Sequence, residues 1–327
     1  MKIYQYIMSF VSLAGKAVPL MVALASCQKD LVYPDTTPKN TLTVRFDWAA
    51  APEADPEEMS LMVYTGTAQP VRFQFTDKAG GEVLLTEGDY QFLAYSSDNE
   101  YYTRGNTWSG FEVYSNETDL NAFSRMFAST RSVPRTRGTE NQLVIYEPEE
   151  LWTGAYQHFS LDIHTVRETV TIPMKDVTYD YNFIIRNVDH LDYVVEIAAT
   201  LTGMSESVYP STGKPSDTAC IIPFPMEKVD ETTVRGSVRT LGHCPGYADD
   251  VYNDHFLVVY VEMKSGGKYY YSIDVTEQMH DIDHLTGGLT YKPIIIDGLP
   301  LPKPITNGSG FQPDITVWNE VNIGIDL

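Results

Sequence analysis

The chain has 327 residues, with 23 lysines and arginines against 44 aspartates and glutamates, so its formal net charge is −21 at pH 7. This acidity argues against binding to nucleic acid or to anionic lipid head groups, because both carry negative charge themselves. Three cysteines exclude a scaffold built from disulfides, and 22 tyrosines beside many valines, isoleucines and threonines favour strands.

Residues 1–26 resemble the signal peptide of a bacterial lipoprotein. Lys2 is followed by two apolar runs and then by Leu24-Ala25-Ser26-Cys27, which matches the lipobox of that class. The resemblance implies cleavage before Cys27 and transfer of a diacylglyceryl group to its thiol. Residues 27–39 would then be a lipidated tether. The membrane would be a partner of the protein, because each CH₂ of the lipid chains that is buried in the bilayer contributes about 0.8 kcal/mol to binding. The alternative is an ordinary secretory signal that ends in a chance cysteine.

Short alternating segments predict strands in residues 40–174. The clearest is 41–48, where Leu42, Val44 and Phe46 alternate with polar residues. Turn residues separate the segments, which favours an N-terminal β-sandwich over a parallel βαβ sheet. The other predicted strands are 59–65, 71–75, 81–85, 90–95, 142–146, 158–164 and 168–174.

Residues 96–138 show the least regular pattern of the first half. They end in a basic segment, Arg125–Arg137, which has four arginines and no acidic residue. We interpret this segment as a loop. A partner contact and a cleavage site for a trypsin-like protease are the functional alternatives.

Residues 175–327 predict a C-terminal β-sandwich, with strands at 177–188, 193–202, 255–263, 268–275, 289–296 and 317–327. Segments 219–224 and 234–241 are interpreted as a hairpin that brings Cys220 close to Cys244. A disulfide between them is expected in an oxidising compartment, although a slip of one residue would point the two side chains apart. We expect 317–327 to pair within its own domain. The alternative is donation to a neighbouring subunit.

No motif in the sequence indicates catalysis: Gly-x-Ser-x-Gly, HExxH, P-loop and GxGxxG patterns are absent. His280 and His284 could ligate a metal on a helix, but a solvated turn is the better interpretation. An acidic cluster at 249–255 lacks the spacing of an EF-hand loop. We therefore expect no enzyme activity, no metal site and no cofactor.

Two Asp-Thr pairs resemble an O-glycosylation pattern of exported bacterial proteins, in which a small or apolar residue follows the threonine. They are Asp35-Thr36-Thr37 and Asp217-Thr218-Ala219. Thr36 and Thr218 are therefore candidate modification sites.

Six stretches together resemble a known family: 88–100, 184–194, 201–213, 241–246, 268–281 and, most specifically, LPLPKPITNGSGFQPDITVWNEV at 299–321. They are similar to the Bacteroidetes lipoproteins of domain-of-unknown-function family 5119, in the fimbrillin-like group of type V pilus subunits, anchors and related adhesins. The resemblance implies an all-β chain of two consecutive transthyretin-like Greek-key β-sandwich domains. It also implies a lipid-anchored protein of the outer membrane, facing the periplasm or the cell exterior, with no catalytic residues.

Two functional hypotheses follow. In the first, the protein acts in pilus assembly, pilus anchoring or cell adhesion, and joins fimbrial subunits by β-strand addition to an open sheet edge. In the second, a surface lipoprotein binds glycan or host protein through aromatic loops, with Tyr101, Tyr102 and Trp108 as a stacking platform.

Overall fold

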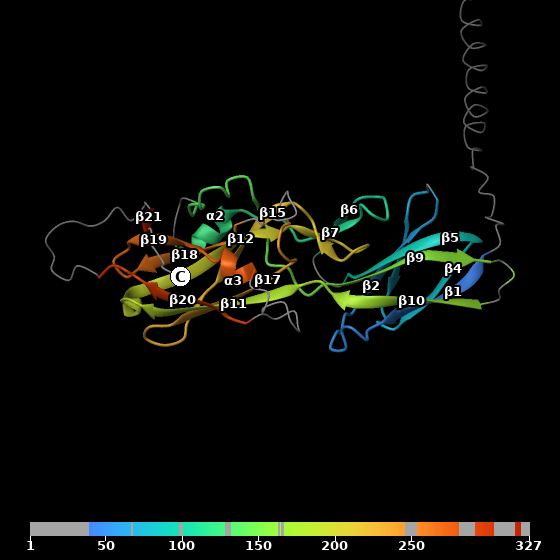
Figure 1. Ribbon diagram of the computed structural model, residues 1–327, viewed down its shortest axis with the longest axis horizontal. Helices are drawn as coiled ribbons and strands as arrows, with labels where there is room; N and C mark the ends of the chain where they lie inside the picture. The colour runs from blue at the N-terminus through green and yellow to red at the C-terminus, as the bar shows by residue number, and fades with distance from the viewer. Residues whose placement is uncertain are drawn as a thin grey trace, which may run out of the picture. The chain divides into compact units, whose positions relative to one another are not determined.

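The computed structural model describes residues 39–66, 68–97, 101–127, 132–162, 164, 167–245, 254–280, 292–303 and 318–321. Strands dominate these residues (Figure 1). Residues 39–327 form one compact unit by their internal contacts. The all-β sandwich prediction is confirmed, whereas the division into two domains at residue 174 stays a prediction.

The first sandwich is one seven-stranded sheet that folds over its own core, in the order β3-β2-β5-β9-β10-β1-β4. All neighbours are antiparallel except β1 and β10. The alternation predicted for 41–48 is present, since Leu42, Val44 and Phe46 are buried in this core. The strands are β1 (Asn40–Asp47), β2 (Met59–Tyr64), β3 (Val71–Phe75), β4 (Gly80–Leu85), β5 (Gly88–Ser96), β9 (Trp152–Leu161) and β10 (Arg167–Asp176).

Strand β10 changes partner at Pro173, which lets the sheet fold into two layers. Its residues up to Pro173 pair with β1, and those from Met174 pair with β9. A proline suits such a change because it has no N–H to give to a ladder. Gly154 of β9 lies opposite Met174, and a Cβ there would come within 2.6 Å of Met174 Sδ and of Pro173 O. Glycine at 154 therefore permits the close approach of the two strands.

The second sandwich consists of two sheets with a core between them. One sheet has the order β16-β17-β11-β20, and the other β21-β19-β18-β12-β15-β8. Phe183 and Phe224 meet in the core from opposite sheets, with stacked rings 5.8 Å apart. The strands are β8 (Leu143–Val144), β11 (Tyr179–Val188), β12 (Val194–Ser205), β15 (Ala219–Pro225), β16 (Glu227–Lys228), β17 (Val234–Thr240), β18 (Phe256–Met263), β19 (Lys268–Asp274), β20 (Ile294–Leu299) and β21 (Trp318–Val321); η2 (Leu191–Tyr193) and α3 (Thr276–His280) connect them.

The predicted hairpin of 219–224 with 234–241 is wrong. Strand β15 pairs with β12, and β17 pairs with β11, so the two segments lie in opposite sheets. Hydrophobic alternation specifies which face of a strand is buried but not which strand lies beside it. The strand predicted at 317–327 is described for Trp318–Val321, and these residues form β21, which pairs with β19 of the same chain.

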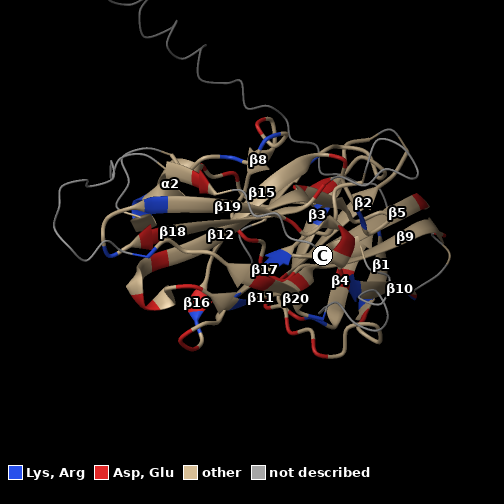
Figure 2. Ribbon diagram, turned by 60° about the vertical axis from the view of Figure 1, so that its left-hand side comes forward, with Lys and Arg blue, Asp and Glu red and all other residues tan. Residues whose placement is uncertain are grey.

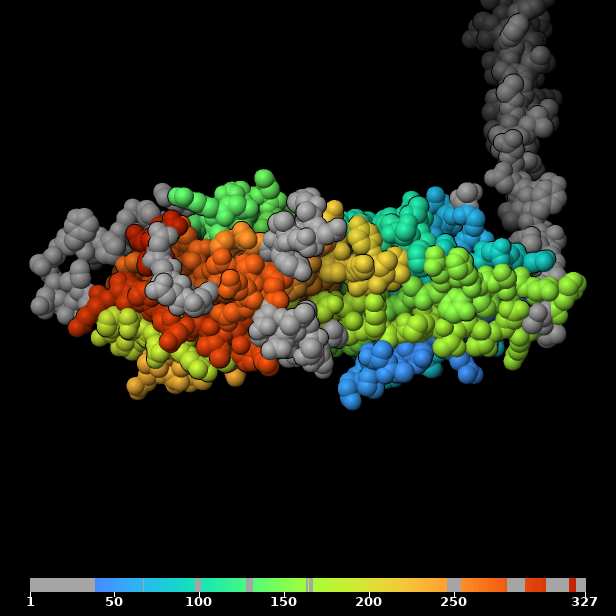
Figure 3. Space-filling model, viewed as in Figure 1, coloured from blue at the N-terminus to red at the C-terminus, as the bar shows by residue number. Residues whose placement is uncertain are grey.

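Residues 117–127 and 132–140, here called the covering segment, pack on the outer face of the six-stranded sheet. The segment begins with α2 (Leu120–Ser124), which Asp119 caps by accepting a hydrogen bond from Ala122 N at 2.8 Å, and with η1 (Arg125–Phe127). Phe123 and Phe127 contact Tyr260 of β18. Figure 3 shows this segment, in green, along the second sandwich. Much of the basic stretch expected to be a loop is thus packed.

A small third sheet joins strands from both halves of the sequence, in the order β14-β13-β7-β6. Its strands are β6 (Tyr102–Arg104), β7 (Glu112–Tyr114), β13 (Ser207–Tyr209) and β14 (Lys214–Pro215). Beside it, Arg104 forms a two-pronged ion pair with Glu206, 2.9 Å on each side. Aspartate and glutamate positions, red in Figure 2, occur on strands and loops across the described residues.

Candidate functional site

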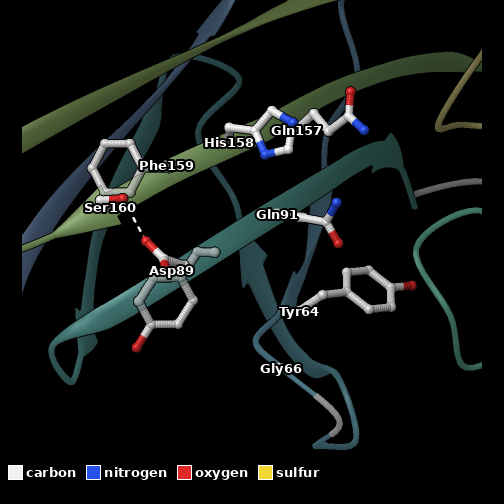
Figure 4. Close-up of a pocket in the computed structure, with 9 residues that line it drawn as sticks. Tyr64, Gly66, Asp89, Gln91, Gln157, His158, Phe159 and Ser160 are labelled. Atoms are coloured by element: carbon white, nitrogen blue, oxygen red, sulfur yellow. Dashed lines mark hydrogen bonds between the residues drawn. The ribbon is translucent and has the colours of Figure 1, made fainter.

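The first sandwich carries a polar hollow of about 450 Å³. The end of β2, the start of β5 and the second half of β9 form it. Figure 4 shows Tyr64 reaching it from β2, Gln91 from β5, and Gln157 and His158 from β9. Ser160 donates a hydrogen bond to Asp89 rather than to His158. The described residues here do not form a serine–histidine pair of the kind that activates a nucleophile.

A second hollow of about 470 Å³ shares Tyr64, Gly66, Gln91 and Gln157 with the first and adds Trp108. We call the two together the polar groove. Among the described residues, neither the buried Tyr64 hydroxyl nor Trp108 Nε1 has a hydrogen-bond partner. Burial raises the pKa of Tyr64 and Tyr95 adds to the effect, so this phenol stays protonated. Amides, hydroxyls and aromatic rings in one concave surface suit a neutral polar ligand.

The aromatic platform predicted from Tyr101, Tyr102 and Trp108 is not assembled. Trp108 lines the polar groove, but Tyr101 donates a hydrogen bond to Glu149 O and lines a separate hollow. Tyr102 packs against Tyr114, with ring centres 5.8 Å apart. Sequence reasoning found Trp108 but missed Tyr64, because the mostly apolar segment that contains Tyr64 indicates a strand and nothing more.

Cys220 and Cys244 are two buried thiols in the structure, not a disulfide. They approach each other through β12 rather than through a hairpin: Met204 pairs with Cys220 on one side, and Gly203 O accepts a hydrogen bond from Cys244 N. Burial raises the pKa of the Cys220 thiol, and Cys244 reinforces the shift. Because thiolates are the reactive form, this thiol is protected from oxidation while buried. The disulfide stays a prediction.

Of the remaining residues singled out in the sequence, some lie outside the described part of the chain and others lie within it. Cys27, Thr36, Arg131, His284 and residues 249–253 lie outside the described part of the chain. Thr218 is half-buried, and its carbonyl accepts a hydrogen bond from Glu206 N. Arg135 donates to the carbonyls of Thr139, Glu140 and Gln142, which ties the covering segment to itself.

Strand β4 presents an unpaired edge of the first sandwich within the described residues. At the start of the ladder between the two strands, Phe46 N of β1 donates a hydrogen bond to Ala79 O. Every second residue after Ala79, which includes Val83 and Leu85, therefore directs its backbone groups toward β1. Since backbone groups of successive residues alternate in direction, Glu82 and Leu84 direct theirs away from β1. Leu84 is also 58% exposed. This edge, with a free backbone row and an apolar side chain, is suited to accept another strand.

Two edge positions of the second sandwich, along β20 and along β15 beyond β8, are obstructed. The side chain of Gln278 accepts from Ile295 N at 3.2 Å and donates to Ile295 O at 3.3 Å, so it occupies the edge of β20. On β15, Ile221 O accepts from Ile145 N, and the next residues on that side are Pro223 and Pro225, which have no N–H. Glutamine capping and edge prolines both hinder strand addition.

Comparison with known proteins gives a family and a shared fold. The profile described as "Domain of unknown function (DUF5119)" matches residues 26–225. A candidate adhesin from Bacteroides ovatus superposes with a TM-score of 0.60 at 16% identity, covering 82% of this chain and 95% of its own. A candidate polysaccharide-binding protein from Bacteroides thetaiotaomicron gives 0.47 at 14% identity, with 79% and 89% covered. The fimbrial anchor protein Mfa2 from Porphyromonas gingivalis gives 0.43 at 12%, with 69% and 79% covered.

No curated protein sequence matches the chain. Among the described residues no helix has the length and apolar character needed to span a membrane. The B. ovatus structure shares the fold over nearly all of its length, and the family profile covers more than half of the present chain. The chain therefore belongs to the DUF5119 family.

Proposed function

We propose that this protein is a non-enzymatic envelope lipoprotein that acts in adhesion or in pilus assembly and anchoring. In this proposal the chain is held on the outer membrane by lipid on Cys27 and accepts a strand of a fimbrial subunit along β4. The observation that carries the proposal is the free edge of β4, which combines outward backbone groups at Glu82 and Leu84 with an exposed leucine. Main-chain hydrogen bonds to such an edge supply affinity, and alternate side chains supply specificity.

The lipid anchor predicts a complete change of localisation in Cys27→Ala. Without the thiol no diacylglyceryl group can be attached, and the hydrocarbon that holds the chain on the membrane is lost. We expect no incorporation of labelled fatty acid and no sedimentation with membranes. Cys220→Ala is the control and should behave as the unaltered protein, because Cys220 is buried in the fold. Fatty-acid labelling of Cys27→Ala would show that the lipobox interpretation is wrong.

Strand addition predicts that Leu84→Pro blocks assembly, whereas Leu84→Thr does not. Proline removes the outward N–H and places a ring at the edge, while threonine keeps the N–H and favours strands. We expect Leu84→Pro to lower the number of pili per cell or the adherence of cells by roughly tenfold, in line with the loss of about one to two hydrogen bonds. Electron microscopy and an adherence assay measure these quantities, and equal melting temperatures would verify the fold of both variants. If Leu84→Pro leaves both quantities unchanged, β4 is not the acceptor edge.

The polar groove supports a second candidate function, the binding of a glycan. Gln91 and Gln157 line both of its hollows and present amides that can pair with sugar hydroxyls beside Tyr64 and Trp108. The double variant Gln91→Ala/Gln157→Ala should lower binding to a glycan array at least tenfold, which corresponds to about 1.4 kcal/mol. Gln74→Ala on β3 is the matched control, since this glutamine is exposed and lies outside the groove. If the unaltered protein binds no glycan on the array, the glycan-binding function is wrong.

A further inference from the structure

Three histidines from separate segments meet at one end of the second sandwich. His243 follows β17, His255 directly precedes β18, and His280 is the last residue of α3. Their ring centres lie 4.5–4.8 Å apart in all three pairs. Gly203 in β12 makes room for this arrangement: its φ is +76°, and a Cβ there would lie 2.8 Å from His255 Nδ1. We call these three residues the histidine cluster.

The hydrogen bonds of the cluster define which ring nitrogens carry protons. His255 Nδ1 lies 3.0 Å from Thr202 O, a carbonyl that can only accept, so Nδ1 carries the proton and Nε2 has a free lone pair. His243 Nδ1 lies 2.9 Å from this Nε2 and therefore donates to it. His243 Nε2 in turn accepts from the Tyr181 hydroxyl at 2.6 Å. Both rings are thus neutral, which is the state in which imidazole binds metal ions.

We propose that His243, His255 and His280 bind one divalent transition-metal ion of the Zn²⁺ type. One ligand nitrogen from each ring lies within 4.8 Å of the other two. A tetrahedral Zn²⁺ with bonds of about 2.0–2.1 Å separates its ligands by roughly 3.4 Å, so the rings need to move by about 1 Å. Imidazole suits Zn²⁺, Cu²⁺ and Ni²⁺, whereas Ca²⁺ and Mg²⁺ take oxygen ligands.

The surroundings of His255 and His243 match those of metal-binding histidines. When Nε2 of His255 binds the ion, its Nδ1–H remains bonded to Thr202 O, and such a carbonyl partner orients most metal-binding histidines. His243 binds through Nδ1 after its proton has moved to Nε2, where the Tyr181 oxygen accepts it. Water takes the proton from Nδ1 and returns one to Nε2, so the ring stays neutral and this change of tautomer releases no net proton.

Binding would add one common tie between three segments of the chain, those that end in His243, begin at His255 and end in His280. His255 is fully buried, whereas His243 and His280 are partly accessible to solvent. In the sequence, His280 was paired only with His284, and a solvated turn was the better interpretation of that pattern. The three ligands are separated by 12 and 25 residues along the chain.

The test is titration of the purified full chain with Zn²⁺, after treatment with a chelator, by calorimetry and by thermal unfolding. We expect one Zn²⁺ per chain and a higher melting temperature with the ion. His243→Ala and His280→Ala should each weaken affinity at least a hundredfold, because loss of an outer partner alone costs about 10–100-fold. His164→Ala is the control, since this histidine is exposed and outside the cluster.

Two outcomes would overturn the proposal. One is the absence of a melting shift and of stoichiometric binding in the unaltered chain, which would leave the cluster as a purely hydrogen-bonded network. The other is binding that persists in His280→Ala. Should a variant not fold, Co²⁺ replaces the substitution test: the unaltered chain should show visible absorption bands of tetrahedral Co²⁺ with nitrogen ligands, and their absence counts against the site.

Discussion

Replacing Arg104 by alanine is expected to lower the free energy of unfolding by about 3–5 kcal/mol, because it leaves a buried carboxylate without its partner. The side chain of Glu206 is only 1% exposed, and both of its oxygens accept from Arg104 at 2.9 Å. Arg104 also pairs with Glu112 at 2.7 Å and lies over the ring of Tyr114. Chemical denaturation, followed by fluorescence, measures the change.

Arg167→Ala provides the matched control for this loss. Arg167 pairs with Glu82 at 3.6 Å, but both side chains are largely exposed. Such pairs contribute about 0–1 kcal/mol, so little change is expected. Glu206→Gln in the background of Arg104→Ala should recover part of the stability by removing the unpaired charge. If Arg104→Ala costs no more than Arg167→Ala, the ion pair does not hold the third sheet together as its geometry indicates.

Phe127→Ala is expected to destabilise the protein by about 3–5 kcal/mol, the usual cost of deleting a buried aromatic ring. Phe127 is fully buried between the covering segment and the six-stranded sheet. Its ring contacts Trp318 of β21 at 5.2 Å and Tyr260 of β18 at 6.3 Å between centres. The substitution would open a cavity beneath the covering segment and weaken the packing of the last described strand. Thermal and urea unfolding give the measurement.

Met126→Ala tests whether the destabilisation by Phe127→Ala comes from the loss of a buried side chain or from a change in η1 itself. Met126 is the residue before Phe127, has 42% of its surface exposed, and should change stability by less than about 0.5 kcal/mol. Limited trypsin digestion adds a second readout. A packed segment should resist cleavage after Arg125 and Arg135 in the unaltered protein and become sensitive in Phe127→Ala. Equal effects of the two alanines would mean that burial of Phe127 does not hold the covering segment on the sheet.

Local patterns were sufficient for the strands and for the family. In β1 the alternation of Leu42, Val44 and Phe46 with polar residues specifies a buried face, because successive side chains of a strand point to opposite sides. The stretches that resemble the family are each continuous in the sequence, so the family can be read directly from the chain. The basic stretch at 125–137 was interpreted as a loop, and its described residues hold one 3-10 turn and no strand. The burial of Phe127 and Val133 within it could not be read from the sequence, because these residues follow no regular period.

The sequence by itself determined the strand content, the acidic surface, the resemblance of residues 1–27 to a lipoprotein signal and the family. Only the tertiary structure decided which strands pair, since alternation selects a face and not a partner. It thereby separated β15 from β17, left β4 at an edge and brought Arg104 to Glu206. The polar groove and the histidine cluster have the same origin. Their residues lie far apart along the chain and become neighbours only when the sheets close over their cores.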